Sequence, residues 1–265
     1  KFMDLNPYIY KTVDYGENWD LITDGIEGEH NFVRVVREDP KVPGLLYAGT
    51  ETGFYISLND GEYWEPFQNN LPIVPINDLY IQDNDLIAAT AGRSFWILDD
   101  LSAIQQSPKD ISVHLVTPKK SYRLSSGKTP KNSTQGTNPM SGVYLDYYLA
   151  EVHDSLEVKI DILQGDLIIR SYTSQKDSLF KSWPGGPSPK TMLKNKKGFN
   201  RTHWDFRREQ LPSVDKVFVY GSYEGSLVAP GMYSAKLTYG DEVKKVDIEI
   251  LPNPNMDYSA ADFEA

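Results

Sequence analysis

The sequence contains no cysteine, which excludes disulfides, thiol catalysis and zinc–thiolate sites. It also lacks any apolar run of the roughly 18 residues that a membrane-spanning helix needs. The chain has fewer basic than acidic residues: it contains 27 Lys and Arg and 37 Asp and Glu, which gives a net charge of -10. Since nucleic-acid backbones bind to basic surfaces, this balance argues against DNA or RNA as a partner. The 265 residues suffice for one large domain or two ordinary ones with a well-buried core.

The signatures of several enzyme families are missing as well. The chain has no Gly-x-Ser-x-Gly elbow, no His-Glu-x-x-His pair, no phosphate loop and no dinucleotide fingerprint. We therefore predict no catalytic residue, no metal and no cofactor. The acidic segment 82–86 (QDNDL) can be read as a calcium loop, but its position between two β-rich runs favours a tight hairpin. None of the four histidines is spaced to share a metal with a neighbour; they are His30, His114, His153 and His203.

Two short stretches near the N-terminus repeat each other at an offset of 57 − 12 = 45 residues: 12–19 reads TVDYGENW and 57–64 reads SLNDGEYW. An Asp or Asn side chain accepts hydrogen bonds from nearby backbone N–H groups, a glycine supplies a positive φ, and a hydroxyl adds a further bond. The tryptophan is expected to bury its ring beside the turn. The pattern therefore predicts a rigid structural turn at Thr12, Asp14, Gly16 and Trp19, and again at Ser57, Asn59, Gly61 and Trp64.

Short β-rich runs surround these two turns and recur after them. Three such runs, with a fourth after the turn, predict a four-stranded antiparallel unit, which is the blade of a β-propeller. An offset of 45 residues lies within the usual blade period, and the last unit lacks the turn, as terminal repeats often do. We therefore predict an all-β chain in which residues 1–118 form the last two to three blades of a propeller.

The repeated turn resembles the Asp-box, or BNR, repeat of sialidases, some xyloglucan-cleaving enzymes and sortilin-type receptor propellers. The resemblance covers about the first 100 residues and implies that both boxes lie on the outer rim of the ring, away from the ligand-binding face. In a propeller the opposite connections line that face, and we expect Glu51 and Arg93 there, in the same connection of successive blades, to grip a ligand or to pair with each other. The other residues expected on this face are His30, Asn31, Asn77 and Asp78.

About two and a half blades cannot close a ring, because closed propellers have roughly four to eight. We expect the remaining blades N-terminal to Lys1, in a longer secreted protein whose signal peptide also lies upstream. The alternatives are that another chain supplies them, or that the exposed blade edge pairs with a second copy. The expected location is extracellular or periplasmic.

The composition changes in the second half of the chain. Residues 119–141 are rich in Ser, Thr, Lys, Gly and Pro and predict a linker. Residues 142–252 alternate in the manner of strands, with turn signals at 163–166 and 239–242, and predict an antiparallel sandwich that resembles Ig-like and fibronectin-III-like modules. Residues 253–265 predict a tail. The basic loop 181–198 is either an anion or glycan contact or a solvated loop.

The segments ATAGRSFWILDDL (89–101) and GFNRTHWDFR (198–207) carry a closer resemblance to large bacterial BNR-repeat proteins, in which such a sandwich follows a propeller. The leading hypothesis is a non-catalytic fragment that serves as a scaffold or as a binding surface for a glycan or peptide. The alternative is the C-terminal part of a glycoside hydrolase of the sialidase or xyloglucanase type. Its catalytic groups would lie mostly on blades absent here, because such sites draw residues from around the ring.

Overall fold

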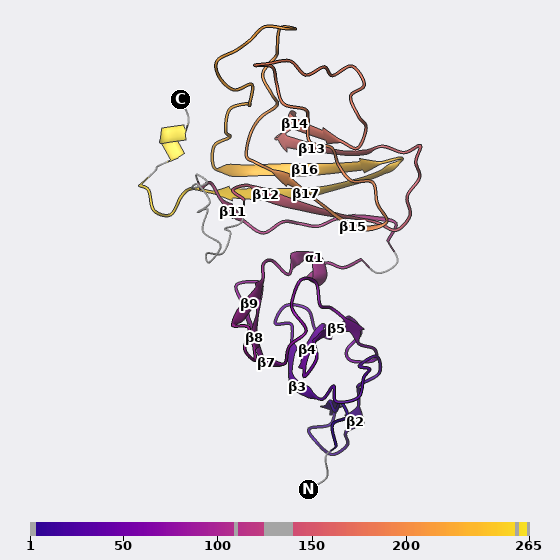
Figure 1. Ribbon diagram of the computed structural model, residues 1–265. Coiled ribbons are helices and arrows are strands. Elements are labelled where there is room, and N and C mark those ends of the chain that lie inside the picture. Colours follow the sequence, from indigo (N-terminus) through magenta and orange to yellow (C-terminus); the bar gives the residue numbers. More distant parts are fainter. Residues whose placement is uncertain (1–3, 109–110, 125–139, 258–259, 264–265) are drawn as a thin grey trace. The chain divides into compact units, whose positions relative to one another are not determined.

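The structure is a computed structural model that describes residues 4–108, 111–124, 140–257 and 260–263. Strands dominate it, and within these residues they form several separate sheets, none of which closes into a barrel (Figure 1). This confirms the prediction of an all-β chain. The chain divides into two compact units, Lys1–Ser107 and Pro108–Ala265.

The first unit contains three small antiparallel sheets. A two-stranded sheet consists of β1 (Tyr10–Lys11) and β2 (Asp20–Leu21). A four-stranded sheet has the order β3 (Val33–Glu38), β4 (Leu46–Thr50), β5 (Phe54–Ser57) and β6 (Glu65–Pro66). A three-stranded sheet has the order β7 (Ile76–Gln82), β8 (Asp85–Thr90) and β9 (Phe95–Leu98), and the short helix α1 (Ser102–Gln105) follows it.

Successive side chains of a strand point to opposite faces of a sheet. Both faces of the four-stranded sheet carry buried apolar residues. One face carries Leu46 and Ala48 and packs against the N-terminal segment around Ile9 and Ile26. The other face carries Tyr47 and packs against the β7–β9 sheet. The first unit is therefore a stack in which this sheet lies between two neighbours.

The second unit is a sandwich of two sheets over one shared core (Figure 1). The smaller sheet has the order β10 (Val113–Leu115), β12 (Val143–Leu149) and β15 (Gly198–Trp204). The larger sheet has the order β11 (Ser121–Tyr122), β17 (Glu242–Leu251), β16 (Gly231–Tyr239), β13 (Val158–Gln164) and β14 (Leu167–Thr173). A 3₁₀ turn, η1 (Ala260–Phe263), lies in the segment predicted as a tail.

The hairpins of the sandwich follow the predicted turn signals. Gly165 turns β13 into β14 with φ 61°, and Gly240 turns β16 into β17 with φ 56°. The predicted hairpin of the first unit is also confirmed, since Asp83 and Asn84 join β7 to β8 with φ 49° and 76°. Two successive positive φ values are typical of the tight turn that matches the twist of a hairpin.

Two predicted boundaries differ from the structure. Residues 113–115 were expected in the first domain, but β10 pairs with β12 and buries Val113 and Leu115 in the core of the sandwich, so the second unit begins at Pro108. Part of the predicted linker is strand β11, which runs parallel to β17, so the sandwich is not wholly antiparallel. A strand of only two or three residues forms because a neighbouring strand pairs with it, and it is too short to show an alternating pattern in the sequence. The linker residues 125–139 lie outside the described residues.

Candidate functional site

The first box turn, between β1 and β2, has the hydrogen bonds that its residues predict. The Thr12 hydroxyl accepts from the Gly16 N–H at 2.8 Å, and the Asp14 carboxylate accepts from the Asn18 N–H at 2.9 Å. The Asn18 backbone and side-chain donors, together with the Thr12 hydroxyl, lower the pKa of Asp14 to about 2. The predicted burial of Trp19 is wrong, because its side chain is 57% exposed.

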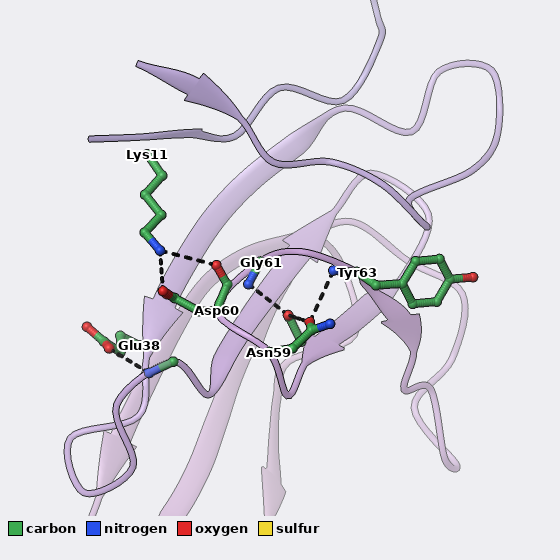
Figure 2. Close-up of polar contacts among 8 residues, drawn as sticks. Lys11, Glu38, Asn59, Asp60, Gly61 and Tyr63 are labelled. Carbon is green, nitrogen blue, oxygen red and sulfur yellow. Dashed lines mark hydrogen bonds and ion pairs between the residues drawn. The ribbon is translucent and has the colours of Figure 1, made fainter. Parts of the chain in front are cut away.

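The second box turn, between β5 and β6, repeats this geometry (Figure 2). The Ser57 hydroxyl accepts from the Gly61 N–H at 3.0 Å, and the Asn59 amide oxygen accepts from the Tyr63 N–H at 3.1 Å. Here the tryptophan, Trp64, is fully buried. A box tryptophan is therefore buried only where another part of the chain forms a pocket for it.

That pocket comes from the segment that carries the first box. Trp64 packs with Ile9 and Ile26 and donates its indole N–H to the Ile22 carbonyl at 2.8 Å. Among the described residues, no segment covers Trp19 in the same way. Its indole instead donates to a carbonyl within its own turn.

The tip of the second box is tied to its surroundings by ionic and backbone contacts (Figure 2). The Lys11 ammonium contacts the Asp60 carboxylate, and the Asp60 N–H donates to the Gly44 carbonyl at 2.8 Å. The Glu38 carboxylate accepts from the Gly44 N–H at 3.0 Å. These contacts occupy the polar groups of the tip, which agrees with a structural role.

The predicted ligand residues lie at the other end of the sheets. In an antiparallel sheet, the β3–β4 and β5–β6 connections share one end and the β4–β5 connection lies at the opposite end. The second box lies in the β5–β6 connection, whereas Glu51 lies in β4–β5 and Arg93 in the equivalent β8–β9 connection. We call the end with the β4–β5 and β8–β9 connections the bulge end.

Each of the two sheets has a β-bulge at this end, in its first strand. The register shift in β3 makes Arg34 the extra residue, and the shift in β7 makes Asn77 the extra residue. A bulge bends the strand and re-aims a side chain, and bulges are over-represented next to functional sites. The predicted Asn77 and the unpredicted Arg34 therefore occupy equivalent positions in neighbouring sheets.

Arg34, and not Arg93, is the partner of Glu51. The Arg34 Nε donates to the Glu51 carboxylate at 2.6 Å, and the guanidinium lies 4.9 Å from the centre of the Phe32 ring. About a third of each charged side chain is exposed. The Arg34 guanidinium thus lies over an aromatic ring, and both charged side chains remain partly exposed to solvent.

The β8–β9 connection fixes the backbone of Arg93 and leaves its side chain exposed. The Thr90 hydroxyl donates to the Ser94 carbonyl at 2.7 Å and accepts from the Arg93 N–H at 3.1 Å. The Trp96 indole donates to the Arg93 carbonyl at 3.0 Å. Thr50 makes the same hydroxyl-to-carbonyl bond in the β4–β5 connection, so the two turns share one plan.

Asn31 is buried and fixes the loop that enters β3. Its amide N–H groups donate to the Glu27 carbonyl at 2.8 Å and to the Tyr55 hydroxyl at 2.9 Å. Its amide oxygen accepts from the Thr52 hydroxyl at 2.6 Å. With both ends of the amide occupied, Asn31 supports the site rather than contacting a ligand.

The remaining predicted residues differ in their surroundings. His30 is exposed and has a left-handed backbone with φ 68°. Asp78 accepts from the Arg37 guanidinium at 2.6 Å, and Arg37 also donates to the Leu79 carbonyl at 3.0 Å. Asp78 therefore links the first strands of the two sheets and is partly engaged by that contact.

The bulge end thus presents two guanidinium groups, a carboxylate and an amide, a set that suits a polar ligand with both donors and acceptors. No group of three or more His, Asp or Glu side chains within the described residues is arranged to hold a metal ion. The sequence did not indicate Arg34, since a bulge depends on the pairing between two strands and leaves no local signal.

Comparisons with known proteins give few similarities. No protein-family model and no curated protein matches the sequence. Among solved structures, the chain is similar to the extracellular domain of a protein described as a hybrid two component system from B. thetaiotaomicron, with a TM-score of 0.29 and 12% identity over 90% of this chain. A similar extracellular domain, of a protein described as a one component system from the same organism, has a TM-score of 0.26 and 13% identity over 90% of this chain. The chain spans 29% and 28% of the lengths of these two domains.

No helix within the described residues is long and apolar enough to cross a membrane.

Proposed function

We propose that the chain is a non-catalytic part of a secreted Asp-box propeller protein, and that the bulge end of its sheets binds a glycan or a peptide. The observation that carries this proposal is the repeated geometry of two neighbouring sheets. Each sheet has a polar residue at its bulge and, at the same end, a connection that is fixed by hydrogen bonds. The side chains that we propose to contact the ligand are Arg34, Glu51, Asn77 and Arg93.

The way the sheets stack supports the propeller arrangement. Ala48 of β4 faces the preceding segment, and Ala88, its equivalent in β8, faces the four-stranded sheet. Each sheet therefore packs the same face on the sheet before it. Such head-to-tail contacts produce a closed ring when the rotation between neighbours allows it.

The last sheet of the stack has one covered face and one exposed face. Tyr80, Phe95 and Ile97 on its outer face are 60%, 73% and 58% exposed. The equivalent face of the four-stranded sheet is covered by β7, β8 and β9. We infer that a further sheet of the same kind covers this outer face, supplied by other blades of a longer polypeptide or by a second copy.

Light scattering distinguishes these two sources. If a second copy covers the face, the 265-residue chain forms an oligomer that Phe95→Glu dissociates. If other blades cover it, the chain is monomeric and the longer polypeptide contains further boxes upstream. The propeller is contradicted if the chain is monomeric and the longer polypeptide has too few additional repeats to close a ring.

Ligand binding is tested with a glycan array and a peptide library on the longest available form of the protein. We expect Arg34→Ala and Arg93→Ala each to weaken binding about tenfold or more, because each removes a charged hydrogen-bond donor. Lys11→Ala removes a positive charge at the box end and serves as the matched control. Unchanged binding by both bulge-end variants would refute the site. Hydrolysis of an array glycan would instead support the glycoside hydrolase alternative.

A further inference from the structure

A two-lobed cleft lies in the second unit, remote in sequence from the bulge end. Its walls come from two long connections, residues 174–197 between β14 and β15 and residues 205–230 between β15 and β16. The lobes have volumes of about 400 Å³ and 290 Å³. They share several wall residues, including Pro187, Pro189 and Gln210, so they adjoin each other. Volumes of this order are typical of small-molecule sites.

Contacts between the two connections fix the walls of the cleft relative to each other. The Lys190 ammonium lies 3.0 Å from the Glu209 carboxylate, and the Gln210 amide donates to the Ser188 carbonyl at 3.3 Å. The Glu209 N–H donates to the Ile169 carbonyl of β14, which ties the wall to the sandwich. A preformed cleft loses little conformational entropy when a ligand binds.

The backbone is strained where β15 enters the cleft wall. Phe206 is buried and has φ 62°, a left-handed conformation that bulky residues rarely adopt. The Trp204 indole donates to the Arg207 carbonyl at 2.8 Å and closes this turn. Strain of this kind persists where the surroundings impose it, and it clusters at ligand sites. The residues on either side, Asp205 and Arg207, both line the smaller lobe.

The smaller lobe is polar and balanced in charge. Its charged groups are two guanidinium groups, Arg170 and Arg207, and two carboxylates, Asp205 and Glu224. The Arg207 guanidinium lies 3.2 Å from the Glu224 carboxylate and 3.8 Å from that of Asp205. An ionised ligand would meet a charge of its own sign here. A hydroxyl group can donate to the carboxylates and accept from the guanidinium groups.

The exposed surface of the larger lobe is mostly apolar, although polar residues outnumber apolar ones in its wall. The apolar residues include Phe180, Pro187, Met192 and Leu211. A pyranose ring has apolar C–H faces and polar hydroxyls at its edge, and the two lobes together match both parts. A peptide that adds a strand to this sheet would need unoccupied backbone groups along the edge of β14. That edge is occupied, because the Ile169 and Thr173 carbonyls already accept from backbone N–H groups of the two connections.

We propose that this cleft binds an uncharged oligosaccharide, with hydroxyls in the polar lobe and a sugar face on the apolar lobe. This gives the sandwich a ligand site of its own, and it does not depend on the function proposed for the bulge end. The GFNRTHWDFR segment, which contains the strained residue and both of its charged neighbours, then forms part of a binding wall.

The test is isothermal titration calorimetry of the full chain with four neutral probes: maltohexaose, cellohexaose, xylohexaose and mannohexaose. We expect at least one probe to bind. Glu224→Ala removes a carboxylate from the polar lobe and Phe180→Ala removes the ring of the apolar lobe, and each should weaken binding about tenfold or more. Glu151→Ala and Met232→Ala change exposed residues elsewhere in the unit and should leave affinity unchanged.

Circular dichroism confirms that each variant is folded, and the exposed position of Glu224 makes its variant the safer one. The proposal is overturned if none of the four probes binds, or if binding survives both cleft variants. It is also overturned if Arg34→Ala abolishes binding while Glu224→Ala does not, since the sugar then occupies the bulge end. Loss of peptide-library binding in the cleft variants, without sugar binding, would assign the cleft to a peptide.

Discussion

The two box tryptophans make a matched pair for a stability experiment. Trp19 and Trp64 follow the same turn motif, but one is largely exposed and the other is fully buried against the preceding segment. We predict that Trp64→Ala strongly destabilises the first unit and that Trp19→Ala changes its stability little.

The difference follows from burial. Truncating a fully buried large aromatic costs about 3–5 kcal/mol, as transfer and cavity terms together. The Trp64 indole also donates to the Ile22 carbonyl, and losing a hydrogen bond costs about 1 kcal/mol. Replacing a surface side chain such as that of Trp19 usually changes stability by no more than about 0.5 kcal/mol. We expect a gap of at least about 3 kcal/mol between the two variants.

Urea unfolding followed by circular dichroism measures the midpoints, and hydrogen exchange resolves the first unit from the second. With a slope of about 1–3 kcal/mol per molar urea, a gap of this size moves the midpoint by about 1 M or more. Trp64→Phe keeps most of the ring but not the indole N–H, so it should fall between the wild type and Trp64→Ala. Equal effects of the two alanine variants would refute the reasoning that the preceding segment decides burial.

Three further predictions concern single residues. Gly25→Ala should destabilise far more than Gly92→Ala, because an added Cβ at Gly25 would lie 2.0 Å from the Trp64 carbonyl oxygen, while nothing lies within 4 Å at Gly92. The positive φ alone costs about 1–2 kcal/mol in both, so equal urea midpoints would contradict the steric argument. The pKa of Asp14 is lowered to about 2, so its stabilising effect is present above about pH 4 and is lost as the pH falls toward 2. A carboxyl NMR titration with a midpoint near 4 would count against this, and Asp14→Asn should remove the dependence. Burial lowers the pKa of His203 below 6.5, so the contribution of His203 to stability should be constant above that pH and decline below it. An imidazole titration at or above 6.5 would be inconsistent with its burial.

Several features were predictable because their causes are local. The box turns need only a hydroxyl, an Asp or Asn and a glycine within a few residues, and the structure shows their hydrogen bonds in both places. The hairpins at Asn84, Gly165 and Gly240 follow from residues that tolerate a positive φ. Alternating apolar residues were enough to predict the long strands of the sandwich, since that pattern has the period of a strand.

The site was only partly predictable. The sequence indicated which connections share an end. The structure has Glu51 and Arg93 in the β4–β5 and β8–β9 connections, at the end opposite the β5–β6 connection that holds the second box. It did not indicate that Glu51 pairs with Arg34, because that contact depends on a bulge in the β3–β4 ladder. Whether the bulge end binds a ligand stays a prediction.

By itself, the sequence determined the β class, the turn chemistry and the absence of thiol chemistry, all of which depend on composition or on neighbours along the chain. The tertiary structure alone decided that Trp64 is buried and Trp19 is not, that strand β10 belongs to the sandwich, and that a strained Phe206 borders a cleft. These features depend on contacts between residues far apart in the chain, and neither periodicity nor turn propensity contains that information.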